Sequence, residues 1–220
     1  MGEKQVTAIP IDRSSVTTPA VLGMLSGGVA WALLMLPGFS AGKGSYTSTL
    51  KGGAEIEISA LTIIPGLIFG VIIGFLWHRY GRAPTRAAFG YALASGIAYF
   101  LAFHVAFNMF DRLPGMLPED AALVVSGIAA GVVGCCLLGV ATVFLFGIPH
   151  QSALGLPVLI GGATGVLLPL INVFSDWDGG FLIFLAAWQG AYAASLAPVL
   201  RPAPTGTSAP SARSPVSPVA

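Results

Sequence analysis

The chain has 220 residues, of which only 9% are charged while 55% are apolar. Soluble domains carry about 25% charged residues, so a soluble globule of this length could not cover its surface. The formal net charge of +1 excludes a protein that binds nucleic acid through a strongly basic surface, and we expect no nucleic-acid partner. A mean hydropathy of +0.84 instead indicates an integral membrane protein surrounded by the lipid bilayer.

Six segments are long and apolar enough to cross a bilayer as helices, which takes about 20 mostly apolar residues each. They are residues 20–38, 60–77, 87–110, 121–147, 153–174 and 181–200. None of them contains Asp, Glu, Lys or Arg, and none alternates between apolar and polar residues as membrane-barrel strands do. The sequence therefore predicts an all-α fold, a polytopic bundle of six transmembrane helices.

Lys and Arg residues divide unequally between the connections of this bundle. Seven of the ten fall on one side, namely Lys4, Arg13, Arg79, Arg82, Arg86, Arg201 and Arg213. Because cytoplasmic connections carry the excess of Lys and Arg, we expect both termini in the cytoplasm. Seven of the nine acids then lie on the outer side, namely Glu55, Glu57, Asp111, Glu119, Asp120, Asp176 and Asp178. This excess of carboxylates makes the outer face the first place to look for a site.

Both ends of the chain and one long connection are expected outside the spanning helices. Residues 1–19 and 201–220 carry too few large apolar side chains to offset the entropy of ordering them. We therefore expect two flexible cytoplasmic tails around a transmembrane domain of residues 20–200, the second tail being rich in Pro and Ser. The longest connection, residues 39–59, ends in AEIEIS, whose alternation is consistent with a short strand or hairpin.

Every expected helix carries small residues four positions apart, which lets helix backbones approach closely in lipid. The glycines of this pattern are Gly23, Gly27, Gly66, Gly70, Gly74, Gly127, Gly131, Gly161 and Gly165. We expect them to pack helices within one chain. A role in a homo-oligomer, or in docking to a larger membrane complex, is the alternative.

Polar residues recur near the outer ends of the third and fifth spans. His104, Asn108 and Asp111 share one stripe of the third helix because they are spaced at i, i+4 and i+7. Asn172 and Asp176 form an i, i+4 pair in and after the fifth, and Asp178 follows. Together these groups predict an outward-facing pocket for a proton, a divalent cation or a basic solute. Alternatively they are ordinary polar helix ends, with His104 hydrogen-bonded to its neighbours.

Gln189 lies near the middle of the sixth span, where an amide must find hydrogen-bond partners. It is either an interhelical contact or a substrate contact. Cys135 and Cys136 are adjacent on the fourth span and point in different directions, so we interpret them as small packing residues. No residue pattern indicates a cofactor, and the identity of any metal is left open.

These patterns describe an architecture better than an activity. We expect a small transporter or permease-like protein whose site is the outer polar cluster. A non-catalytic accessory subunit of a larger membrane complex is the alternative, and an integral-membrane enzyme is a third possibility. The compact loops favour a bacterial plasma membrane, that is, an inner membrane.

Overall fold

The structure is a computed structural model that describes residues 13–36, 46–49, 55–79, 84–173 and 179–200. The expected tail 201–220 and residues 1–12 of the other tail lie outside these ranges. Residues 13–19, which we expected in the flexible tail, are instead helical, because α1 spans Arg13–Leu34. The polar Ser and Thr residues of these first two turns lowered the local hydropathy without preventing the helix.

Helices account for nearly all of the described chain. After α1 come α2 (Ala60–Arg79), α3 (Thr85–Arg112), α4 (Glu119–Phe146), α5 (His150–Gly165), α6 (Leu170–Val173), α7 (Gly179–Ser195) and α8 (Ala197–Leu200). Five stretches are long and apolar enough to cross a membrane, namely Val16–Leu34, Ala60–Arg79, Thr85–Arg112, Glu119–Phe146 and Gly179–Val199. The chain is therefore an α-helical protein of the multi-pass membrane class.

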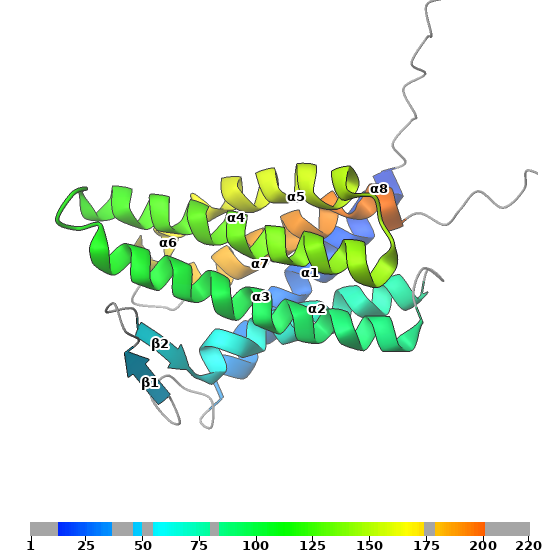
Figure 1. Cartoon of the computed structure of the whole chain (residues 1–220), viewed down its shortest axis with the longest axis horizontal. Helices are drawn as coiled ribbons and strands as arrows, with labels where there is room; N and C mark the ends of the chain where they lie inside the picture. Colours follow the sequence, from blue (N-terminus) through cyan, green and yellow to red (C-terminus); the bar gives the residue numbers. More distant parts are fainter. Residues whose placement is uncertain (1–12, 37–45, 50–54, 80–83, 174–178, 201–220) are drawn as a thin grey trace, which may run out of the picture.

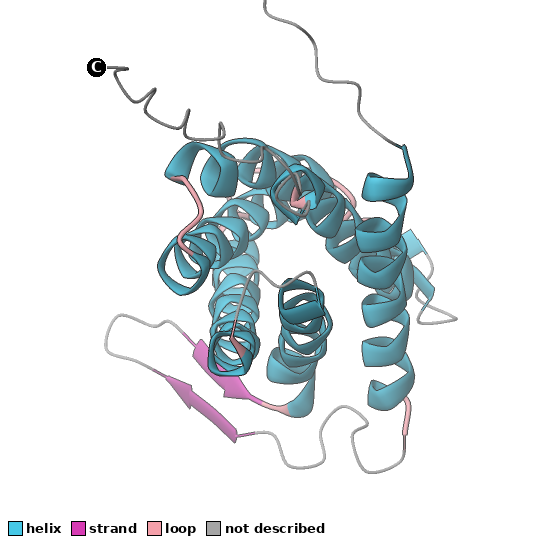
Figure 2. Cartoon of the chain, turned by 90° about the vertical axis from the view of Figure 1, so that its right-hand side faces the viewer, coloured by secondary structure: helices cyan, strands magenta, loops and turns pink. Residues whose placement is uncertain are grey.

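The six longer helices form a closed circle in which each contacts its two neighbours. The order around the circle is α1, α2, α3, α4, α5, α7 and back to α1. Figure 1 shows the helices running side by side along the long axis, and Figure 2 looks along the bundle from one end. The start of α1 and the short α8 lie at one end, here called the termini end, and the strands β1 (Tyr46–Thr49) and β2 (Glu55–Ile58) lie at the other, the hairpin end.

Prolines and one glycine set the ends of the middle helices. α3, α4 and α5 each begin directly after a proline, whose fixed φ suits a helix start and whose missing N–H is not needed there. α4 ends at Gly147, which has a φ of 66° and donates its N–H to the carbonyl of Val143 at 2.9 Å. A left-handed residue closes a helix this way at least cost when it lacks a Cβ.

The fifth expected span, 153–174, is not one continuous helix. α5 ends at Gly165, residues 166–169 form turns closed by i to i+3 hydrogen bonds, and α6 follows. Pro169 supplies the physical reason, because its ring clashes with the carbonyl four residues earlier, that of Gly165. Pro65 and Pro157 are tolerated inside α2 and α5, so the break requires Pro169 together with the weak helix formers Gly162 and Gly165.

Close backbone contacts join three pairs of helices. A Cβ added to Gly27 would lie 2.7 Å from the backbone nitrogen of Ala186 on α7, and one added to Gly70 would lie 2.6 Å from the Cα of Ala92 on α3. Gly127 and Gly131 on α4 meet the backbone of Gly165 and Gly161 on α5 in the same manner. Glycine at these positions therefore permits the observed spacing of the helices.

The interior of the bundle is filled with aromatic rings toward the termini end. Trp77 and Tyr91 pack on Phe146 with ring centroids 4.5 and 5.3 Å away, and Tyr192 packs edge-on to Phe69 at 5.7 Å. The side chains of Trp77, Tyr91, Tyr192 and Phe69 are at most 1% exposed. The termini half of the bundle is thus solidly packed.

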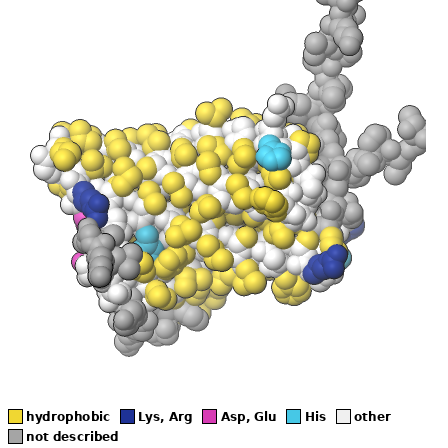
Figure 3. Space-filling model, in the orientation of Figure 1, with side chains coloured by type: hydrophobic (Ala, Val, Ile, Leu, Met, Phe, Trp, Pro, Cys, Tyr) yellow, Lys and Arg dark blue, Asp and Glu magenta, His cyan; other side chains and the backbone are white. Residues whose placement is uncertain are grey.

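The outer surface is apolar along the middle of the bundle and charged at its ends. Figure 3 shows hydrophobic side chains covering the middle of the face in view. Phe89 and Phe144 are 69% and 83% exposed, as expected for side chains that meet lipid. The exposed Arg79 and Arg86 lie at the termini end, whereas the exposed Asp111 and Glu119 lie at the hairpin end.

Candidate functional site

The alternating segment that predicted a strand is β2, one arm of a two-stranded antiparallel hairpin. Tyr46 pairs with Ile58 and Thr49 pairs with Glu55. Successive residues of a strand direct their backbone N–H groups to opposite edges. The N–H groups of Ile56 and Ile58 therefore point toward β1, and those of Glu55 and Glu57 point away from it. That second edge lies against α3.

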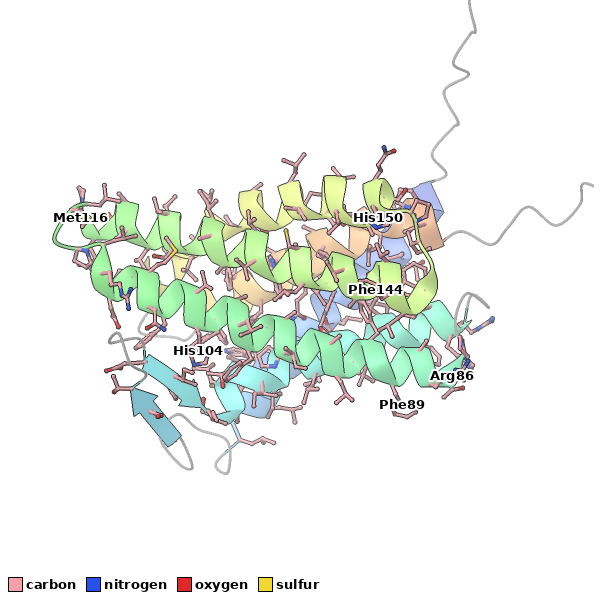
Figure 4. The ribbon with its side chains drawn as sticks, in the orientation of Figure 1. Arg86, Phe89, His104, Met116, Phe144 and His150 are labelled. Atoms are coloured by element: carbon pink, nitrogen blue, oxygen red, sulfur yellow. The ribbon has the colours of Figure 1, made fainter. Side chains whose placement is uncertain are left out.

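His104 and Asn108 on α3 pair with this free edge of β2. The backbone N–H of Glu57 donates to Nε2 of His104 at 2.7 Å. The backbone N–H of Glu55 donates to Oδ1 of Asn108 at 2.8 Å, and Nδ2 of Asn108 donates to the Glu55 carbonyl at 2.8 Å. Figure 4 shows His104 beside β2. Two side chains of a helix thus replace the third strand that would otherwise satisfy the edge.

The spacing explains why residues four apart on the helix perform this role. Four residues of an α-helix rise about 6 Å, and two residues of a strand rise about 6.8 Å. The i, i+4 stripe of α3 therefore matches the i, i+2 stripe of β2. The helical stripe that we interpreted as part of a solute pocket is engaged in holding the hairpin.

The hydrogen bonds of His104 also define its tautomer. Nδ1 lies 2.7 Å from the carbonyl oxygen of Phe100, which can only accept, so Nδ1 carries the proton. Nε2 is then the acceptor for Glu57. Both ring nitrogens of this 8% exposed side chain are occupied, so a metal or solute could bind here only after the hairpin leaves.

The remaining members of the expected polar cluster do not add to a described site. Asp111 is exposed at the end of α3. The side chain of Asn172, and both Asp176 and Asp178, lie outside the described residues. Within the ranges that the structure covers, no group of three or more His, Cys, Asp or Glu side chains could hold a metal ion.

Gln189 on α7 is fully buried and joins three helices. Its Nε2 donates to the Pro65 carbonyl on α2 at 3.2 Å, and its Oε1 accepts from the Ser26 hydroxyl on α1. Because a carbonyl can only accept, the amide must face Pro65 with its nitrogen, which leaves the oxygen for Ser26. The amide is therefore held on both sides by neighbouring helices.

A cavity of about 200 Å³ lies inside the hairpin half of the bundle. Four elements enclose it, namely α3, α4, the junction of α5 and α6, and α7. The lining residues are Tyr99, Ala102, Phe103, Ala106, Phe107, Phe110, Leu123, Gly127, Ala130, Gly131, Gly165, Leu168, Ile171, Phe181, Phe184 and Trp188. This lining is almost entirely hydrocarbon and aromatic ring, and it contains no charged side chain.

The shape of the cavity follows from the positions of its lining residues. On α3 they run from Tyr99 to Phe110, which is about 16 Å along the axis at 1.5 Å per residue. Trp188 marks the deep end, where its ring lies 6.1 Å from that of Tyr99 and 6.3 Å from that of Phe69. The packed aromatic rings of the termini half begin at this layer, so the cavity reaches from the hairpin end to about the middle of the bundle.

The break between α5 and α6 is part of the cavity wall, because Gly165, Leu168 and Ile171 all line it. Irregular backbone at membrane depth is tolerated where it is buried in protein or lines a cavity. The carbonyls at the end of α5 are satisfied by the turns that follow, since the N–H groups of Leu167 and Leu168 donate to the Thr164 and Gly165 carbonyls at 3.0 Å. The break therefore shapes the cavity while these backbone groups remain hydrogen-bonded.

Sequence reasoning did not identify this cavity. A usable signal was present on α3, where Phe103, Phe107 and Phe110 alternate with Ala102 and Ala106 on one face. Large and very small side chains on a shared face leave gaps that a neighbouring helix must fill. Whether the neighbour fills them depends on other helices, so the pattern alone predicts either a tight contact or a hollow.

Comparisons with protein-family models, curated proteins and solved structures find no match to this chain. The site must therefore be interpreted from its own geometry.

Proposed function

We propose that this protein is a small transporter whose substrate is a lipophilic molecule, and that the substrate binds in the cavity lined by Phe103, Phe107 and Trp188. The supporting observation is the asymmetry of the interior, which is hollow and apolar in the hairpin half and filled with aromatic rings in the other half. An apolar cavity of about 150 Å³ stays dry and binds small apolar molecules. The cavity here is larger than that.

The break between α5 and α6 supports transport of the bound molecule rather than its permanent retention in the cavity. Substrate sites of secondary transporters lie near the bilayer midplane and are commonly built from discontinuous helices. Here Gly165 and Leu168, on either side of the break, contact the same cavity whose deep end is Trp188. A cavity that occupies the hairpin half and ends at mid-depth matches one state of an alternating-access cycle. The α5–α6 junction is the element we expect to move.

The proposed transporter crosses the membrane six times. α4 and α7 both run from the hairpin end to the termini end, so the chain between them must cross in the opposite direction, and α5 with α6 supplies that crossing. Arg79 and Arg86 at the termini end support placing this end in the cytoplasm. We propose a bacterial plasma membrane as the location.

The glycine contacts favour this proposal over an accessory subunit. An accessory subunit docking through its glycine faces would leave those faces open to a partner. All nine glycines of the predicted small-residue pattern instead meet another helix of the same chain, as Gly23 meets Gln189 and Gly74 meets Ala88. Glycine packing within one chain thus leaves these positions unavailable to a partner complex or to a second copy.

A transbilayer-movement assay tests the transport proposal. The protein would be reconstituted in vesicles containing either a fluorescent phosphatidylethanolamine or a fluorescent sterol, and a reductant would be added outside. We expect at least one of these lipophilic probes to exchange faster than in protein-free vesicles. Ala130→Phe, which fills the cavity, should abolish the increase.

Val125→Phe is the matched control, because Val125 lies on the same helix but is 39% exposed on the outer surface. It should leave the exchange rate unchanged. Transport of lipophilic molecules through this cavity is refuted if neither probe moves faster than in protein-free vesicles, or if Ala130→Phe behaves like the wild type. Stoichiometric co-purification with a larger membrane complex in mild detergent would favour the accessory subunit.

A further inference from the structure

We infer that the molecule entering the cavity is a phospholipid, with one acyl chain between α3, α4 and α7 and a zwitterionic headgroup at the hairpin end. This inference rests on the proposed function, since it names the substrate class of the same cavity. Three features of the described residues support it: the chemistry of the lining, the elongated shape, and the charge next to the hairpin-end limit of the cavity.

The chemistry of the lining favours a hydrocarbon segment. Apart from Tyr99 and Trp188 at the deep end, the lining side chains carry no hydrogen-bonding atom. Sites for polar ligands fix orientation with a few placed donors and acceptors. A buried polar group without such partners would lose its hydration and gain nothing. The part of the ligand that enters must therefore be apolar along its whole length.

The shape of the cavity favours a flexible chain. Its volume of about 200 Å³ is below the roughly 300–1,000 Å³ of pockets for drug-sized ligands. The same volume extends along about 16 Å of α3, so the cavity is long and narrow. Ala102, Ala106 and Ala130 leave this narrow space between the flanking aromatic rings. A single acyl chain matches these dimensions better than a rigid fused-ring molecule.

The charges just beyond the hairpin-end limit of the cavity select the headgroup. Asp111 directly follows the lining residue Phe110 on α3, and Glu119 and Asp120 lie about one turn beyond the lining residue Leu123 on α4. All three carboxylates are exposed, and Arg112 is the one cation on the same two helix ends. The balance of three acids against one base repels an anionic headgroup. It suits a headgroup that carries both a phosphate and an ammonium group.

The position of the cavity matches the source of such a ligand. The cavity lies at the depth of the spanning segments, where the surrounding medium is lipid, and it runs from the hairpin end to mid-bundle. A phospholipid of the adjacent leaflet already holds its headgroup at the interface and its chain parallel to the helices. It can therefore occupy the cavity without exposing its chain to water.

Trp188 provides a reporter at the deep end of the cavity. In a variant that retains only this tryptophan (Trp31→Phe, Trp77→Phe and Trp177→Phe), fluorescence would be measured in bilayers containing phosphatidylethanolamine brominated on its acyl chain. We expect saturable quenching of Trp188, because the bromines reach the deep end with the chain. Brominated phosphatidylglycerol should quench less at equal mole fraction.

Adding Ala130→Phe to this variant should remove the quenching, and adding Val125→Phe should retain it. Quenching that is absent with both lipids, or that survives Ala130→Phe, overturns the assignment of an acyl chain to the cavity. Equal quenching by both lipids overturns the headgroup assignment.

Because Trp77 is buried against Phe146, its replacement could impair folding. Native mass spectrometry of the chain with its tryptophans intact, in equal amounts of the two lipids, gives an independent reading. Phosphatidylethanolamine adducts should exceed phosphatidylglycerol adducts in the wild type and be lost in Ala130→Phe, and equal or unchanged adducts contradict the inference.

The two proposals can fail separately. If the sterol probe moves faster with protein while neither brominated lipid quenches Trp188, transport stands and the phospholipid assignment is wrong. If Trp188 is quenched but neither fluorescent probe moves faster, the lipid site stands and transport is wrong.

Discussion

Adjacent glycines on α1 allow the packing of this bundle to be tested with a matched pair of substitutions. A Cβ added to Gly27 would lie 2.7 Å from the backbone nitrogen of Ala186 and 2.9 Å from its Cα. A Cβ added to Gly28 would have no atom within 4 Å outside its own helix surroundings. Gly27→Ala should therefore destabilise the protein much more than Gly28→Ala.

The expected difference in the free energy of unfolding is estimated by comparing the two variants with each other. Non-bonded carbon atoms are most stable about 3.5–4.0 Å apart, so Gly27→Ala requires α1 and α7 to separate by nearly 1 Å. Overpacking of this kind costs about 1–3 kcal/mol. The gain in helix propensity from Gly to Ala, up to about 1 kcal/mol, is common to both variants and cancels. The unfolding equilibrium constants of the two variants should thus differ by a factor between about 5 and about 150.

Equilibrium unfolding in mixed micelles of increasing SDS content, followed by circular dichroism, measures this difference. Gly28→Ala should unfold at or above the wild-type SDS fraction, and Gly27→Ala at a clearly lower one. Equal midpoints for the two variants would show that α1 and α7 do not pack through Gly27, and the argument from close backbone contact would then be wrong.

Two further predictions concern the polar contacts. Gln189→Met keeps the volume but removes two interhelical hydrogen bonds worth about 0.6 kcal/mol each, so it should cost about 1 kcal/mol in the same SDS titration. Ser195→Ala, which loses a bond only to its own helix, should cost less. His104→Phe removes the acceptor of the Glu57 amide and should accelerate hydrogen exchange there. Asn108→Leu should do the same at the Glu55 amide. Unchanged exchange in both variants would contradict the docking of the hairpin on α3.

Much of the secondary structure could be predicted because lipid imposes local rules. The segments 60–77, 87–110 and 121–147 correspond to α2, α3 and α4 with ends that agree within two residues. A spanning helix must be apolar over its whole length, and that property is visible in the sequence. Hydropathy predicted one continuous helix where the structure has a break after Gly165. Hydropathy contains no information on the clash between Pro169 and the preceding turn.

The candidate site could be predicted only in part. The i, i+4 relation of His104 and Asn108 follows from helix geometry, and both residues do share one face of α3. Their partners on β2 lie far away in the chain, 47 residues before His104 and 53 residues before Asn108. No local pattern indicates which of several outer segments would meet that face. His104 and Asn108, which we expected to line a pocket, thus hydrogen-bond to β2.

The sequence by itself determined that this is a helical membrane protein, where most of its helices lie and how its charges divide between the two ends. Each of these properties depends only on the hydropathy and charge of residues that are neighbours in the sequence. In a bilayer, such local properties decide which segments form spanning helices. Only the tertiary structure decided that the polar stripe of α3 holds a hairpin and that the interior is hollow next to Phe107 and solid next to Trp77. A cavity is the volume left by side chains from four separate elements, so it exists only once those elements are placed together.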